Sequence, residues 1–166
     1  MTMTEIILDF FKSFPPELAT VLIAMIPITE LRVSIPVALE VFKLPVLSAI
    51  WWSVVGAMIP TTVILVFIGD IANWFCQHSP FLKRLYNHTV LRTEKKFKDS
   101  AAKYGIGLGL VIFVAIPLPF TGAWSGALAT FLLGMPKRFA WIMIFIGIVI
   151  SAIIVALASL GIFKIF

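Results

Sequence analysis

The chain has 166 residues, of which 61% are hydrophobic and only 13% are charged, and its mean hydropathy is +1.08. A soluble domain of this size cannot bury so much apolar surface, so the composition excludes a soluble fold and predicts lipid as the solvent. The net charge of +5 does not indicate nucleic acid, because seven of the thirteen Lys and Arg residues gather between Lys83 and Lys103, a signal of membrane orientation.

The chain begins with segments that are too short to cross a membrane. Residues 4–14 predict an amphipathic helix that lies at the membrane interface, within a region that covers residues 1–17. Two apolar halves follow at residues 18–29 and 33–42. Each is shorter than the ~20 residues that a helix needs to cross the hydrocarbon core. They form either one kinked span or a hairpin that enters and leaves the membrane at the same face.

The junction of these two halves carries charge inside an apolar stretch. It contains Glu30 and Arg32 together with Pro27 and Pro36. Ionisable residues in a membrane segment are costly, and they are functional-site candidates by default. Proline lacks the backbone N–H of a helix interior, so Pro27 and Pro36 are predicted to break the helix. The alternative interpretation is a kinked spanning helix in which Glu30 and Arg32 neutralise each other for structural reasons.

A long span and a basic linker follow. Residues 46–68 are long enough to cross the membrane with some tilt, and a kink is predicted at Pro60. Residues 76–105 contain more than half of the positive charges, so we expect this linker in the cytoplasm, with Gly105 as a helix stop. Its two histidines have no acidic or cysteine companions, so no metal site is expected.

The second half of the chain repeats this order. Residues 106–116 and 127–135 are short apolar halves, and residues 139–163 form the last candidate span. A second break lies between the short halves, from Pro117 to Gly126, and it is without charge. It offers hydroxyl groups, an indole ring, and glycines that allow close approach of the backbone.

The two halves match as an internal repeat. The Ile-Pro pair at residues 26–27 matches the pair at residues 116–117, and with one residue of slack Gly56 falls on Gly147. We predict a single membrane domain over residues 1–166. Its predicted parts are an interfacial helix (1–17), repeat 1 (18–75), a basic linker (76–105) and repeat 2 (106–166).

The predicted fold class is an all-α polytopic membrane protein with two inverted repeats, each a re-entrant helical hairpin plus one transmembrane helix. The alternative is four full transmembrane helices, which would make the repeats parallel. Counting positive charges does not separate the two arrangements, but the shortness of the halves favours hairpins. Irregular backbone at membrane depth must be buried in protein or line a wet cavity. The termini lie outside in the hairpin arrangement and inside in the other.

Two motifs carry a resemblance to a known family. One is Glu30-Leu31-Arg32 with Ile35-Pro36, and the other runs from Ala115 to Ala127. They resemble the small multidrug export protein family, and the resemblance covers nearly the whole chain from about Leu18. Phe120 stands where the family pattern usually has glycine. The chain is more distantly similar to DedA-type membrane proteins, whose inverted re-entrant hairpins are linked to translocation of lipid carriers.

The two breaks and the resemblance imply a small membrane transporter or exporter that moves an amphipathic or anionic lipid-like substrate between two hairpin tips. Free N–H groups at a tip and the guanidinium of Arg32 suit a phosphate or carboxylate, and Glu30 is a candidate proton carrier. Alternatives are a DedA-like polyprenyl-phosphate or lipid flippase and a non-transporting membrane assembly factor. The predicted substrate-binding residues are Glu30, Arg32, Ser34, Thr121, Gly122, Trp124 and Ser125. The predicted structural breaks are Pro27, Pro36, Pro117, Pro119 and Gly126.

We expect no enzymatic activity, cofactor or metal, because the sequence contains no zinc-binding helix motif, no serine elbow and no paired catalytic aspartates. The expected partners are membrane lipid, a small amphipathic or lipid-phosphate substrate, and protons, but not nucleic acid. A homodimer is a further candidate, because four or so membrane elements are few to enclose a path. The expected location is the cell (inner) membrane, as a multi-pass protein.

Overall fold

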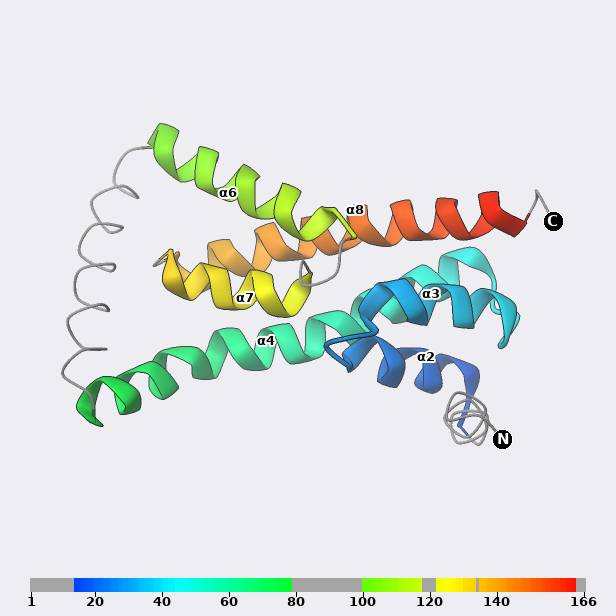
Figure 1. Ribbon diagram of the computed structural model, residues 1–166, viewed down its shortest axis with the longest axis horizontal. Coiled ribbons are helices and arrows are strands. Elements are labelled where there is room, and N and C mark those ends of the chain that lie inside the picture. The colour runs from blue at the N-terminus through cyan, green and yellow to red at the C-terminus, as the bar shows by residue number, and fades with distance from the viewer. Residues whose placement is uncertain (1–13, 79–99, 118–121, 134, 164–166) are drawn as a thin grey trace. The chain divides into compact units, whose positions relative to one another are not determined.

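The computed structural model describes residues 14–78, 100–117, 122–133 and 135–163. These residues contain helices and connecting turns but no strand, which confirms the all-helical prediction for them (Figure 1). The interfacial helix predicted at residues 4–14 and most of the basic linker lie outside the described residues. The helices are α2 (Pro16–Met25), α3 (Glu30–Glu40), α4 (Val46–His78), α6 (Ser100–Ala115), α7 (Ala123–Leu132) and α8 (Lys137–Phe163).

The chain divides into two compact units that share the two long helices. Unit 1 consists of residues 1–59 and 149–166, and it contains α2, α3, the first part of α4 and the last part of α8. Unit 2 consists of residues 60–148, and it contains the rest of α4, both α6 and α7, and the first part of α8. Each unit therefore combines one pair of short helices with a part of each long helix.

The long helices α4 and α8 have the length and composition of membrane spans. Val46–Phe67 has a mean hydropathy of 1.9, and Lys137–Gly161 has a mean hydropathy of 2.9. Their outer faces are also apolar: Val63, Phe67 and Leu157 are exposed over 51%, 53% and 65% of their surface. A long helix that is apolar on all sides fits a hydrocarbon solvent, whereas water would penalise such an exposed surface. The chain is therefore a helical membrane protein.

Several small residues lie on the buried faces of the long helices. In unit 1, α4 buries Ala49, Ser53 and Gly56, and in unit 2, α8 buries Ala140 and Gly147. Residues spaced by three, four or seven positions lie on one face of a helix. Because lipid supplies no hydrophobic drive between helices, small residues that allow close packing are typical of such faces.

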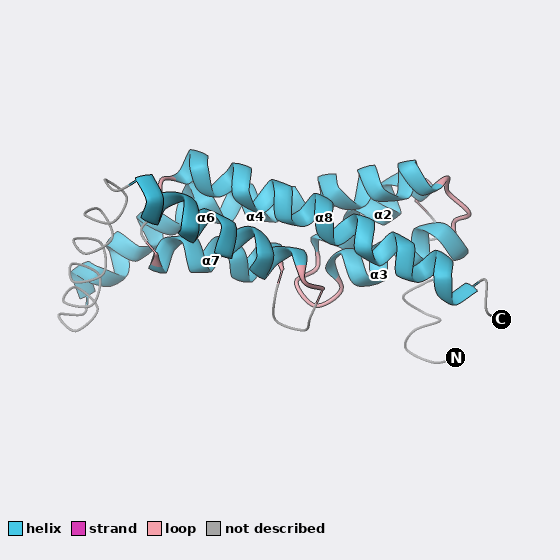
Figure 2. Ribbon diagram, turned by 90° about the horizontal axis from the view of Figure 1, so that it is seen from above, coloured by secondary structure: helices cyan, strands magenta, loops and turns pink. Residues whose placement is uncertain are grey.

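The short helices pack in pairs. α2 lies beside α3 in unit 1, and α6 lies beside α7 in unit 2 (Figures 1 and 2). The buried face of α3 contains Leu31, Ile35 and Ala38, which recur at the spacing of one helix face. A helix of 10 residues such as α2 is only ~15 Å long, about half the thickness of a hydrocarbon core. In each unit the two short helices contact one another.

The prediction that Pro36 breaks the helix is wrong. Pro36 lies inside α3, which continues to Glu40, and α4 likewise runs through Pro60. Pro36 removes one backbone hydrogen bond, but Ile35 and Ala38 on either side of it are fully buried and hold the segment in place. Interior prolines are tolerated in membrane helices because neighbouring groups satisfy the released backbone atoms. Among the predicted breaks, Pro27 lies in the turn between α2 and α3.

The predictions of a helix stop at Gly105 and of a break at Gly126 are also wrong. Gly105 lies inside α6, and Gly126 lies inside α7. Glycine ends a helix when it adopts a left-handed conformation, and neither residue does so. Gly126 is instead buried, and a Cβ atom there would lie 2.7 Å from Cγ2 of Val114. Its role is to let α7 approach α6.

Candidate functional site

The turn between α2 and α3 is closed by its own hydrogen bonds. The hydroxyl of Thr29 donates to the carbonyl of Ile23 at 2.7 Å, and the backbone N–H of Glu30 donates to the carbonyl of Ile26 at 3.0 Å. The last carbonyls of a helix have no partner within that helix, and the Thr29 hydroxyl supplies one to the carbonyl of Ile23. The turn is thereby fixed to the helix that precedes it.

Glu30 occupies the most unusual position in this turn. It is the first residue of α3, it is only 8% exposed, and its backbone φ is 40°. A residue with a side chain at positive φ costs about 1–3 kcal/mol, and such strain concentrates at functional sites. The carboxylate belongs to the first turn of α3, where the helix dipole favours negative charge. The structure thus keeps Glu30 as the leading candidate.

Both second helices of the pairs begin earlier than the sequence predicts. α3 begins at Glu30, so the half-buried Arg32 lies on its first turn. α7 begins at Ala123, which places the half-buried Trp124 and Ser125 on its first turn. Regular helix geometry therefore fixes the backbone of Arg32, Trp124 and Ser125.

The turn before α7 depends on glycine. Gly122 precedes the helix with φ 157° and ψ −164°, a combination that is essentially confined to glycine. The hydroxyl of Ser125 donates to the carbonyl of Gly122 at 3.3 Å, so Ser125 makes a local bond at the helix start. Pro117 is half-buried at the end of α6. The predicted residues Pro119 and Thr121 lie outside the described residues.

Ser34 lies in the interior of unit 1. It is fully buried on α3, and its hydroxyl donates to the hydroxyl of Ser53 on α4 at 2.9 Å. Ser53 is also fully buried, and the sequence analysis missed it. The feature that could have indicated Ser53 is a hydroxyl inside an apolar span, on the same helix face as Ala49 and Gly56. This bond links α3 to α4 and holds the helix that carries Glu30.

A double-mutant cycle measures the bond between Ser34 and Ser53. Ser34→Ala is expected to lower the free energy of unfolding by about 1 kcal/mol, because it leaves the hydroxyl of Ser53 buried with one partner fewer. The double variant Ser34→Ala/Ser53→Ala is expected to lose about 0.6 kcal/mol less than the sum of the single variants, as found for such bonds in membrane bundles. Unfolding of the purified protein in mixed micelles gives both values. Strictly additive losses would argue against the bond.

The structure gathers the predicted site residues into two groups. Glu30, Arg32 and Ser34 belong to α3 in unit 1, whereas Trp124 and Ser125 belong to α7 in unit 2. Except for Ser34, which lies one turn further along α3, the residues of both groups lie where the second helix of a packed pair begins. This arrangement can offer a carboxylate and a guanidinium in one group, and a hydroxyl, an indole and open backbone in the other.

In the described part of the chain, two long apolar helices, two pairs of short helices and the charged first turn of α3 define a helical membrane protein. Comparison with protein families supports this class. The model of the family described as "Putative small multi-drug export protein" matches residues 30–154, and the chain belongs to this family. The match begins at Glu30 and extends into α8. Comparisons with curated proteins and with solved structures find no match.

Proposed function

We propose that this chain is a small membrane exporter of an amphipathic or anionic lipid-like substrate, and that the start of α3 is the charged part of its substrate site. The observation that carries the proposal is Glu30, a buried carboxylate held at positive φ on the first turn of α3. Arg32 follows on the same turn and is half-buried. Membership of a family described by export supports transport as the function.

Each residue at the start of α3 has a role that its chemistry suits. Arg32 presents a planar fork of N–H donors that fits a phosphate or a carboxylate. The N-terminal end of α3 adds backbone donors and the positive end of the helix dipole. Glu30 is assigned as the proton carrier that couples export to a proton gradient.

The proposal assigns the uncharged part of the site to the turn before α7. That part comprises Thr121, Gly122, Trp124 and Ser125. Trp124 can pack against a lipid chain or an organic cation. Cross-linking of cysteines placed at residues 32 and 125 in an otherwise cysteine-free chain tests whether the two turns form one site. Efficient cross-linking that the transported substrate reduces would support this assignment.

Two substrate classes make different demands on the charged turn. A proton-coupled exporter of cationic compounds depends most on Glu30, whereas a flippase for a polyprenyl phosphate depends most on Arg32. Purified protein in liposomes should be assayed with a polyprenyl phosphate and with a cationic dye, while proton release on substrate addition is recorded. Transport of neither compound, with normal complementation by a variant lacking both charges, would favour the third alternative, an assembly factor.

We also propose that the two pairs of short helices are re-entrant hairpins in inverted repeats. Two observations support this arrangement. The short helices lie side by side in each unit. In addition, Gly56 meets Val21 and Ala24 of α2, while Gly147 meets Val111 and Val114 of α6. In both cases the glycine of the long helix packs against the first short helix of the same half: α4 against α2, and α8 against α6. A repeat that aligns Gly56 with Gly147 requires these two equivalent contacts.

The re-entrant arrangement predicts where the termini lie. Each repeat crosses the membrane once, so both termini are expected outside the cell membrane and the basic linker inside. A reporter that is active only in the cytoplasm should be inactive after Phe166 and active when inserted after Asn87. Activity at both positions would contradict the re-entrant arrangement and favour four full spans.

A further inference from the structure

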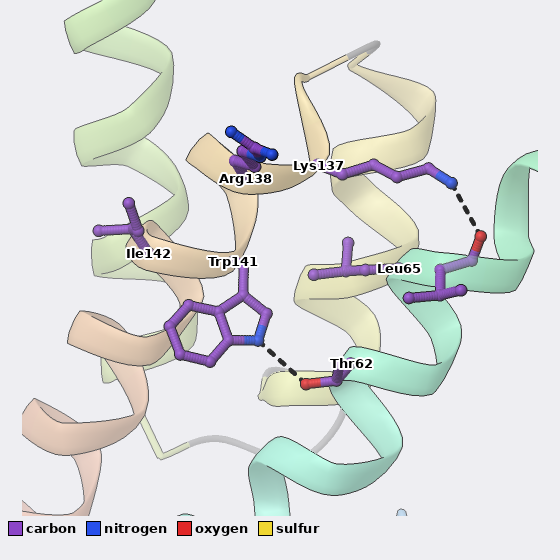
Figure 3. Close-up of a pocket in the computed structure, with 7 residues that line it drawn as sticks. Thr62, Leu65, Lys137, Arg138, Trp141 and Ile142 are labelled. Carbon is purple, nitrogen blue, oxygen red and sulfur yellow. Dashed lines mark hydrogen bonds between the residues drawn. The ribbon is translucent and has the colours of Figure 1, made fainter.

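Unit 2 contains a groove that the proposed export site does not use. Its volume is about 430 Å³, and it lies between α4 and the start of α8 (Figure 3). Leu65, which is only 4% exposed, lies beneath it. The lining residues are Thr62, Leu65, Val66, Lys137, Arg138, Trp141 and Ile142.

Polar groups hold the two walls of the groove together. Nε1 of Trp141 donates to the hydroxyl of Thr62 at 3.0 Å, and Nζ of Lys137 donates to the carbonyl of Val66 at 2.8 Å (Figure 3). The indole also stacks on Phe145, with ring centroids 5.6 Å apart. The two hydrogen bonds join α4 to α8 across the groove.

The surface of the groove is almost entirely apolar, and the cationic groups of Lys137 and Arg138 lie at its margin. Lys137 and Arg138 lie together at the first turn of α8, while Leu65, Ile142 and the indole ring supply apolar surface (Figure 3). The lining contains no acidic residue. The side chain of Arg138 is exposed. Its guanidinium forms no hydrogen bond or ion pair with any residue that the structure describes. A ligand that complements this surface carries a negative group next to an apolar chain.

The position of the groove in the membrane identifies such a ligand. The apolar segment of α4 ends at Phe67, and that of α8 begins at Lys137, so the cationic margin lies where the hydrocarbon core gives way to headgroups. Tryptophan and basic residues are typical of this boundary. The phosphate of a lipid lies at this depth, and its acyl chains point along the apolar wall.

We propose that this groove is a binding site for an anionic membrane phospholipid. The phosphate is held by Arg138, with Lys137 beside it, and an acyl chain lies against Ile142 and the ring of Trp141. This lipid is bound from the surrounding bilayer and is not the exported substrate. The proposal therefore stands apart from the export site at Glu30 and Arg32.

Native mass spectrometry of the full chain in detergent can test this site. Phosphatidylglycerol and phosphatidylcholine with identical acyl chains are titrated onto the protein. Phosphatidylglycerol should bind more tightly, and Arg138→Gln should weaken it about tenfold, because hydrogen bonds to charged groups contribute at this level. Arg138→Lys should retain most of the preference, and Arg138→Glu should abolish it.

One further variant completes the experiment. Lys43→Gln removes an exposed cation outside the groove, so it should bind phosphatidylglycerol as the unaltered chain does. Equal binding of the two lipids by the unaltered protein would overturn the proposal. An equal loss in Lys43→Gln and Arg138→Gln would do so too, since it would reduce the effect to net charge. Lipid binding is measured with Arg138 variants and export with Glu30 and Arg32 variants, so the two proposals can fail separately.

Discussion

Arg32→Ala is expected to lower export by at least about tenfold, while the protein still inserts into the membrane at normal levels. The guanidinium is the strongest donor on the first turn of α3, and it is half-buried where water competes poorly. Export from proteoliposomes, normalised to the amount of folded protein, measures the effect. Arg32→Lys keeps the charge but loses the planar fork, so it should recover only part of the activity.

Glu30→Gln is expected to give the same loss by a different route. Gln has the shape of Glu and can occupy the same strained backbone position, but its side-chain amide cannot gain or lose a proton near neutral pH. Export driven by a proton gradient should therefore stop, whereas substrate binding measured without a gradient should persist. Glu40→Gln is the matched control, because Glu40 is the half-buried carboxylate at the other end of α3.

Normal export by both Arg32→Ala and Glu30→Gln would remove the site from the start of α3. A loss of export in Glu40→Gln as large as in Glu30→Gln would indicate that any carboxylate change on α3 disturbs the helix. A result confined to Glu30 and Arg32 is the one that the backbone strain at Glu30 leads us to expect.

The membrane character of the fold could be predicted from composition alone, because a soluble domain of this size cannot bury so many apolar residues. The predicted long spans at residues 46–68 and 139–163 fall within α4 and α8. The ends of the short helices could not be predicted as well. Pro36, for example, does not break α3, although its residue type predicts a break. Its effect depends on the burial of its neighbours, and helices distant in sequence determine that burial.

The candidate site could be located from sequence but not described. A Glu and an Arg in an apolar stretch are conspicuous, so the sequence predicts residues 30 and 32 as site residues. The positive φ of Glu30 was not predictable, because a left-handed Glu has no local sequence signal. The groove at Lys137 was missed for another reason: the basic pair at residues 137–138 marks the end of a span equally well without any cavity beside it.

Gly56→Ala is expected to destabilise the protein by about 3 kcal/mol, the largest structural effect that we predict. A Cβ atom at this position would lie 2.5 Å from the carbonyl oxygen of Val21 and 2.7 Å from Cβ of Ala24. Since the first of these is backbone, relief requires α2 and α4 to move apart. The gain in helix propensity from Gly to Ala, about 1 kcal/mol, is smaller than this cost.

Gly147→Ala is expected to cost about 2 kcal/mol for the same physical reason. Its Cβ atom would lie 2.8 Å from Cβ of Val114 and 3.0 Å from the carbonyl oxygen of Val111, so the crowding is slightly less severe. Denaturant titration of the purified variants in micelles measures both losses. Equal stability of Gly147→Ala and the unaltered chain would show that α8 and α6 do not approach closely in solution.

Two other glycines on the same long helices, Gly69 and Gly161, are controls for these losses of stability. A Cβ atom at Gly69 of α4 would meet only the end of the Lys137 side chain, at 3.7 Å, and one at Gly161 of α8 would meet nothing within 4 Å. Gly69→Ala and Gly161→Ala should therefore leave the free energy of unfolding unchanged or raise it. If Gly56 and Gly147 are sensitive while these two are not, the cost arises at one equivalent position in each half of the chain. Because the internal repeat aligns Gly56 with Gly147, this result would support the repeat.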